Sequence, residues 1–156
     1  MSDLKATVEK DLAAAMKARD TARVGTLRMI VAAIRAEEVA GKSARDLDDQ
    51  EVIAVLAREV KKRGEAAEIY RSNDRPELAD KERAEQAIIE EYLPAQLDEE
   101  ALTALVDDAI AQVRTETGAE PGMRQMGQVM KVATAAAAGG VDGKRLSTAV
   151  RARLAG

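Results

Sequence analysis

Four residue types that carry much of protein chemistry are absent from this chain: cysteine, histidine, phenylalanine and tryptophan. Without cysteine there is no disulfide and no thiolate metal site, and nothing implies an oxidising compartment. Without histidine the commonest general base, the Ser-His-Asp arrangement and most transition-metal sites are excluded. We therefore predict no metal, no cofactor and no catalytic residue, and an enzyme would need Asp, Glu, Lys, Tyr or Arg for all of its chemistry.

Long apolar runs are also missing. The first residues, Met1-Ser2-Asp3-Leu4-Lys5, lack the apolar stretch of a signal peptide, and no segment approaches the roughly 20 apolar residues of a membrane span. The sequence thus predicts a soluble protein of the cytoplasm with no membrane partner.

What the chain does contain favours helices. Hydrophobic residues make up 46% of its 156 residues, but Tyr70 and Tyr92 are the only aromatic ones. The core must be built from Leu, Ile, Val, Met and many alanines, and alanine is the best helix former. The near absence of aromatic and Thr-rich alternating runs argues against strands. We predict an all-α protein.

Capping signals divide the chain into seven helices. Ser2 or Asp3 caps the first, Asp48 begins the third with Glu51 in a capping-box position, and Asp98 caps the fifth. Pro94 disfavours helix just before it, which makes this the predicted domain boundary. The sequence predicts a four-helix N-terminal bundle domain over residues 1–93 and a small three-helix C-terminal domain over residues 94–156.

Positive charge is concentrated at the C-terminal end. Residues 121–156 hold six basic residues and one acidic residue, whereas residues 1–120 hold 18 basic and 27 acidic ones. This distribution is typical of a protein that presents one cationic surface while the rest of the chain stays acidic.

The segment Gly139–Lys144 lies within this basic end. It is not a P-loop, because its glycines are one residue too close, Arg145 replaces the Ser or Thr that would hold magnesium, and no strand precedes it. One interpretation is a turn in which the glycines end one helix and Asp142 caps the next. The helix that follows also clusters Lys144, Thr148 and Arg151 on its polar face, at an N-terminus suited to phosphate. The alternative is an ordinary solvated face.

A second basic cluster, Arg58-Glu59-Val60-Lys61-Lys62-Arg63-Gly64-Glu65, lies on the predicted third helix. Its two glutamates are interleaved at helical spacing, so we interpret this cluster as ion pairs within the helix rather than a binding surface.

Several short segments, taken together in order and spacing, resemble the YqeY-like proteins, a bacterial family related to the C-terminal tail of the GatB component of the tRNA-dependent amidotransferase. The segments that carry the resemblance are Ala14–Asp20, Thr26–Ile30, Glu51–Leu56, Glu59–Arg63, Glu91–Leu97, Met126–Met130 and Val141–Lys144.

The resemblance implies an N-terminal helical bundle and a three-helix C-terminal domain that, in the amidotransferase, helps to hold tRNA. The positions that match the family's motifs with phosphate-suited chemistry are Lys131, Gly143 and Lys144. Arg145 and Arg151 are added on physical grounds. The alanine-rich stretch 131–136 departs from the family, in which a proline and another lysine are expected.

Our leading hypothesis is a non-catalytic module that binds tRNA or another structured RNA through Lys131, Gly143, Lys144, Arg145 and Arg151. An alternative is a protein adaptor, a partner of amidotransferase or synthetase components, that uses the long third helix and the groove between the two predicted domains. A third hypothesis is carbon–nitrogen ligase activity with glutamine as amido donor. It follows from kinship alone, because the chain lacks the amidotransferase's transamidating domain.

Overall fold

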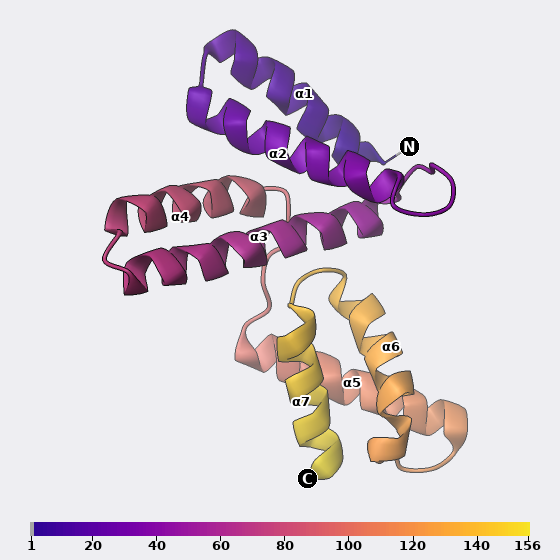
Figure 1. The fold of residues 1–156 in the computed structure, drawn as a ribbon. Coiled ribbons are helices and arrows are strands. Elements are labelled where there is room, and N and C mark those ends of the chain that lie inside the picture. Colours follow the sequence, from indigo (N-terminus) through magenta and orange to yellow (C-terminus); the bar gives the residue numbers. More distant parts are fainter. Residues whose placement is uncertain (1) are drawn as a thin grey trace. The chain divides into compact units, whose positions relative to one another are not determined.

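A computed structural model describes residues 2–156, and within this range it contains helices and no strand. The all-α fold class predicted from the sequence is therefore confirmed. Contacts divide the chain into two compact units, the first ending at Leu93 and the second beginning at Pro94. Each unit is described by itself below (Figure 1).

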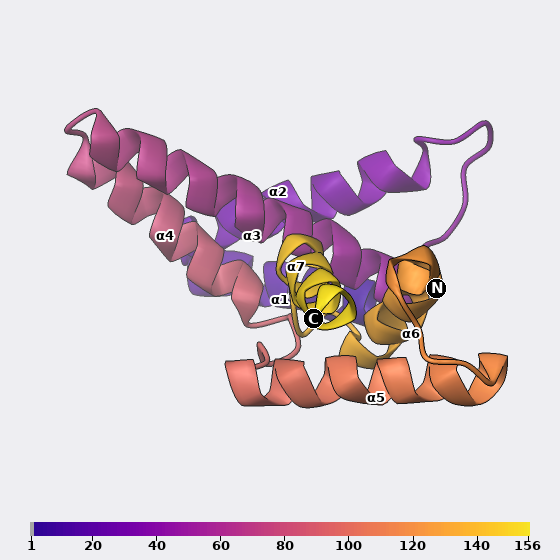
Figure 2. The ribbon, with the colours of Figure 1, turned by 90° about the horizontal axis from the view of Figure 1, so that it is seen from below.

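Unit 1 is built from two helical hairpins. The first hairpin joins α1 (Asp3–Ala18) to α2 (Thr21–Glu38), and the second joins α3 (Asp49–Ser72) to α4 (Pro76–Glu90). The helices α3 and α4 run side by side in both views (Figures 1 and 2).

Local capping explains where these helices begin. The hydroxyl of Ser2 accepts a hydrogen bond from the amide of Lys5, and Asp48 and Glu51 form the predicted capping box at the start of α3. The Ser2 hydroxyl also donates to the carboxylate of Asp49, which ties the start of α1 to the start of α3.

The core of unit 1 contains no aromatic residue among its fully buried side chains. Tyr92 packs against it only as a partly buried side chain. The aliphatic core predicted from composition is thus confirmed, and its buried members are Val8, Ala15, Leu27, Ile30, Val31, Ile34, Leu47, Val52, Val55, Leu56 and Ile89.

Unit 2 packs three helices around a second aliphatic core. These helices are α5 (Glu99–Thr117), α6 (Met126–Ala137), which is preceded by the short 3₁₀ turn η1 (Met123–Gln125), and α7 (Gly143–Ala155). Each of the three contacts the other two (Figure 2). Their buried side chains are Leu102, Val106, Ala109, Ile110, Val113, Val129, Ala133, Val141, Leu146 and Val150.

Candidate nucleic-acid interface

The start of α7 leaves two backbone donors open. Asp142 is the N-cap, and its carboxylate accepts from the amide of Arg145 at 2.8 Å, as predicted. Its carbonyl accepts from the amide of Leu146. Within residues 2–156 the amides of Gly143 and Lys144 find no acceptor. These are the donors that a helix N-terminus offers to an anion.

The glycine at the first position of α7 is not required by the fold. Gly143 is exposed, its φ is not positive, and a Cβ placed there would meet nothing within 4 Å. Any need for glycine at this position therefore comes from outside the folded unit, as when a ligand approaches the backbone closely.

The two preceding glycines serve the turn instead. Gly139 has a φ of +88°, and a Cβ on Gly140 would lie 3.1 Å from the carbonyl oxygen of Ala137 and 3.3 Å from that of Ala95. The carbonyl of Gly140 also accepts from the amide of Leu97 at 2.7 Å. Gly139 and Gly140 form the turn between the helices, as interpreted, but the left-handed residue that ends α6 is Ala138 and not a glycine.

A shallow groove of about 400 Å³ runs beside the first turns of α7. Lys144 and Thr148 line it and are both exposed, and Arg151 is exposed about one turn further along the helix. Neither Lys144 nor Arg151 forms an ion pair with any residue of the described chain. The groove is lined by Glu99, Leu102, Asp142, Lys144, Arg145, Thr148, Ala149 and Ala152.

Arg145 is engaged differently from its neighbours. One guanidinium nitrogen donates to the carbonyl oxygen of Leu97 at 2.7 Å and another to the carboxylate of Glu99 at 2.6 Å. Its side chain therefore fastens the segment before α5 to α7. The sequence carries no local signal for these contacts, because both partners lie more than 40 positions away.

Lys131 lies on a different helix from the other candidates. It is exposed on α6, away from the buried Val129 and Ala133, and no ion pair holds it within residues 2–156. No hydrogen bond or ion pair of the described chain joins its side chain to α7, so the structure does not bring all five predicted residues into one contact network.

Pairing with α5 reduces the positive charge of unit 2. Arg145 pairs with Glu99, and Arg153 pairs with Asp107 at 2.7 Å. Residues 94–156 hold seven basic and eight acidic residues, a net charge of −1. The cationic character therefore belongs to individual exposed side chains on α6 and α7 and not to the whole unit.

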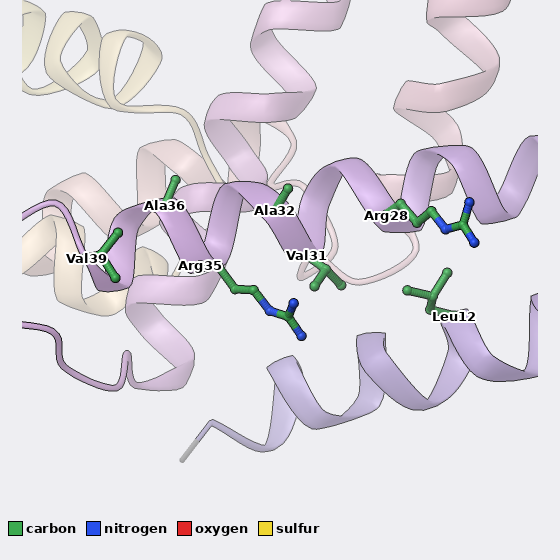
Figure 3. A pocket seen from close by; sticks show the side chains of 7 residues that line it. All are labelled: Leu12, Arg28, Val31, Ala32, Arg35, Ala36 and Val39. Atoms are coloured by element: carbon green, nitrogen blue, oxygen red, sulfur yellow. The ribbon is translucent and has the colours of Figure 1, made fainter.

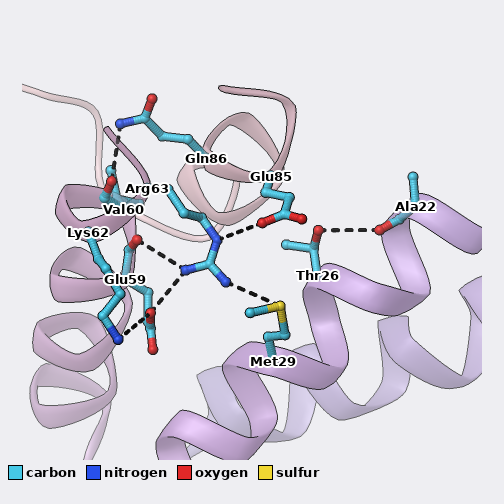
Figure 4. A network of polar contacts seen from close by, with 9 residues as sticks. All are labelled: Ala22, Thr26, Met29, Glu59, Val60, Lys62, Arg63, Glu85 and Gln86. Atoms are coloured by element: carbon cyan, nitrogen blue, oxygen red, sulfur yellow. Dashed lines mark hydrogen bonds and ion pairs between the residues drawn. The ribbon is translucent and has the colours of Figure 1, made fainter. Parts of the chain in front are cut away.

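Unit 1 contains a buried arginine that the sequence analysis missed. Arg63, in the basic cluster of α3, is only 3% exposed. Its guanidinium donates to the carboxylate of Glu59 at 2.9 Å, to that of Glu85 on α4 at 3.2 Å, and to the sulfur of Met29 on α2 at 3.5 Å (Figure 4). Arg63 therefore joins three helices.

The rest of that cluster follows the prediction of ion pairs within the helix only in part. Lys62 pairs with Glu59 on the same helix, and Arg58 pairs across to Glu37 on α2. The burial of Arg63 did have a signal in the sequence, because position 63 falls between Val60 and Ala67 on the apolar line of α3.

A second network of polar contacts in unit 1 joins α1 and α2 to the turn after α4. The hydroxyl of Tyr92 donates to the carboxylate of Asp11 at 2.6 Å, and Arg23 pairs with Glu91 at 2.7 Å. Burial, together with the hydrogen bond to Asp11, raises the pKa of Tyr92 to about 12.

Two further questions bear on function: whether any helix could span a membrane, and whether acidic side chains cluster as metal ligands do. None of the helices among residues 2–156 is both long enough and apolar enough to cross a membrane. Over the same residues, no group of three or more acidic side chains is arranged to hold a metal ion.

Comparison of the sequence with known families gives the class of this protein. Residues 5–154 match the family described as Yqey-like protein, and the chain belongs to this family. The resemblance drawn from the sequence is thereby confirmed.

Three named proteins are among those similar in sequence to this chain. "Altered inheritance of mitochondria protein 41, mitochondrial" of Meyerozyma guilliermondii is 32% identical over 130 residues, which cover 81% of this chain and 66% of the relative. The protein of the same name in Kluyveromyces lactis is 32% identical over 114 residues, covering 71% and 58%. An uncharacterized protein of Schizosaccharomyces pombe is 33% identical over 93 residues, covering 59% and 73%.

The chain thus spans about two thirds or less of the two mitochondrial relatives. Their names give a compartment but no substrate, reaction or partner.

Proposed function

We propose that this YqeY-family protein is a non-catalytic module that binds tRNA or another structured RNA through α7 and the neighbouring face of α6. The observation that carries the proposal is the combination of open amides at Gly143 and Lys144 with the unpaired, exposed side chains of Lys144 and Arg151. Backbone amides at a helix start and nearby cations together favour phosphate groups.

Shape and phosphate, rather than base stacking, would dominate recognition. Unit 2 contains no aromatic residue, since Tyr70 and Tyr92 both lie in unit 1. Stacking platforms for unpaired bases are therefore lacking there, whereas duplex segments of a folded RNA present phosphates and 2′-hydroxyls.

Two carboxylates limit how the RNA can approach. Asp142 and Glu99 line the groove beside Lys144, so a phosphate is favoured on the outer face of α7 and not deep in the groove. In this arrangement Arg145 neutralises Glu99 and holds the start of α7 in place. The phosphates are contacted by Lys131, Lys144 and Arg151.

The compartment forms part of the proposal. The cytoplasmic location expected from the sequence stays a prediction, and the mitochondrial names of the fungal relatives point to an organelle that also contains tRNA. Association with tRNA-dependent amidotransferase components is supported by the family resemblance alone.

The test is the salt dependence of binding to bulk tRNA and to duplex DNA, measured by fluorescence anisotropy between about 50 and 200 mM salt. Three phosphate contacts predict a log–log slope of about −2.7 on a duplex. The double variant Lys144→Ala/Arg151→Ala should bring the slope to about −0.9, while the circular dichroism spectrum stays unchanged.

A matched control removes two other exposed cations that lack ion pairs within the described residues, Lys61 and Lys81 of unit 1. The Lys61→Ala/Lys81→Ala variant should keep the wild-type slope. An equal change of slope in both double variants, equal weak binding to tRNA and DNA, or no binding at the lowest salt would each contradict the proposal.

A further inference from the structure

The outer side of the α1–α2 hairpin contains a groove distinct from the candidate RNA interface. Its volume is about 550 Å³, and five of its seven lining residues are apolar. One residue comes from α1 and six come from α2 or its C-cap, and these are Leu12, Arg28, Val31, Ala32, Arg35, Ala36 and Val39 (Figure 3). We call it the α1–α2 groove.

Apolar surface remains exposed along this groove. Val39 at its end is 64% exposed, and Met16, one turn beyond Leu12 on α1, is 50% exposed. Ala32 and Ala36 are also exposed and lie one turn apart on α2. Residues 28–39 extend over about 17 Å of helix, enough for two to three turns of a second helix to lie alongside.

The charges beside the groove have one predominant sign. Arg28 and Arg35 flank Val31 along α2 (Figure 3). Arg28 has no ion pair within the described chain, and Arg35 makes one long contact of 3.3 Å with Glu9 while staying largely exposed.

The acidic residues of α2 pair with cations of other helices and do not balance these arginines. Glu37 pairs with Arg58 of α3, and Glu38 pairs with Lys5 of α1 at 2.6 Å. The exposed residues of the helix itself include no acid, and they are Thr21, Ala22, Gly25, Arg28, Met29, Ala32, Arg35 and Ala36. In a chain with 28 acidic residues, a helix face without one is a distinct surface.

We propose that the α1–α2 groove binds an amphipathic helix of another protein, one that places acidic residues beside its apolar stripe. The apolar floor would take the stripe, and Arg28 and Arg35 would pair with carboxylates at its edges. A second copy of this chain fits poorly, because a two-fold contact through this face would bring exposed arginines against arginines, and Glu9 already pairs with Arg35 within each copy.

This surface differs from the one expected from the sequence for an adaptor, which was the long third helix and the groove between the two predicted domains. It is also independent of the proposed RNA interface, which lies in unit 2. One molecule could use both, and the two can be tested separately.

The experiment uses the full chain, labelled with ¹⁵N, and two synthetic helical peptides of about 16 residues. Both peptides carry leucine at every third or fourth position. One has glutamate on both flanks of the leucine stripe, and the other has lysine there. We expect the glutamate peptide to shift the amide signals of residues 28–39 and to bind about tenfold more tightly than the lysine peptide.

Two variants and one control localise the effect. Ala36→Glu places bulk and negative charge in the groove and should weaken binding of the glutamate peptide by about tenfold or more. Arg28→Glu should weaken it less, and mainly at low salt. The control is Ala87→Glu, which makes the same change at an exposed alanine of α4 and should leave binding unchanged.

The proposal is overturned if neither peptide binds, if both bind equally, or if Ala36→Glu and Ala87→Glu behave alike. It is also overturned if the same amide signals shift with tRNA or anionic lipid vesicles but not with peptide. A concentration-dependent dimer that Ala36→Glu dissociates would assign the groove to a second copy instead.

Discussion

Replacing Arg63 with alanine should lower the free energy of unfolding of unit 1 by about 3 kcal/mol. The side chain is 3% exposed, and its two carboxylate partners, Glu59 and Glu85, are 16% and 19% exposed. Removing the guanidinium leaves Glu85 without a counter-charge and Glu59 with only the 3.6 Å contact to Lys62, and breaking a buried ion pair in this way generally costs about 3–5 kcal/mol. The lower end applies because both partners keep some contact with water.

Urea unfolding followed by circular dichroism at the helix band measures this cost. With a slope of about 1–3 kcal/mol per molar urea, a loss of about 3 kcal/mol moves the midpoint of unit 1 by about 1–3 M. The matched control is Arg58→Ala on the same helix. The side chains of Arg58 and its partner Glu37 are 63% and 40% exposed, so the expected loss is about 0–1 kcal/mol.

A third variant separates loss of charge balance from loss of packing. Arg63→Met combined with Glu59→Gln and Glu85→Gln removes the buried charges while filling similar space, and it should recover much of the stability. If Arg63→Ala costs no more than Arg58→Ala, or if the triple variant is as unstable as Arg63→Ala, the reasoning about uncompensated charge is refuted.

Two further predictions concern the end of unit 1 and the turn before α7. Tyr92 should ionise with a midpoint of about 12 in an absorbance titration, and Tyr92→Phe should abolish that step. Because the folded chain holds the Tyr92 proton more tightly than the unfolded chain, stability should fall as pH rises from about 10 to about 12, and pH-independent stability there would contradict the assignment. Gly140→Ala should destabilise unit 2 by about 1–3 kcal/mol, because its Cβ would press on two backbone carbonyls. Gly143→Ala should leave thermal stability unchanged while weakening tRNA binding, and equal melting temperatures for the two variants would show that the turn is not tightly packed.

Local chemistry was the part of this fold that could be predicted from the sequence. Asp48, Asp98 and Asp142 cap helices where expected, because a cap depends on the side chain and an amide three residues away. The aliphatic core followed from composition for a similar reason, since few other side chains were available to fill it.

Contacts between distant residues could not be predicted in the same way. Arg63 lies in a run of charged residues that is typical of a surface, and its burial also depends on Glu85 of α4, a partner 22 positions away that the sequence does not indicate. Arg145 shares a basic run with Lys144, but only the folded unit brings Leu97 and Glu99 against it. In the candidate RNA site, the sequence therefore grouped Arg145 with the phosphate-binding cations, whereas the structure shows it held by Leu97 and Glu99.

The hydrogen bond between Asp11 and Tyr92 also bears on how the chain folds while it is being made. It spans 81 positions and joins α1 to the turn after α4, so unit 1 cannot complete its last contact until nearly all of its residues have left the ribosome. Before that point the α1–α2 hairpin can form from local contacts alone, whereas Arg63 of α3 has Glu59 of its own helix but lacks its second carboxylate, Glu85 of α4. The face of α3 that α4 covers therefore stays open until α4 emerges, and during that interval the nascent chain would depend most on protection by chaperones.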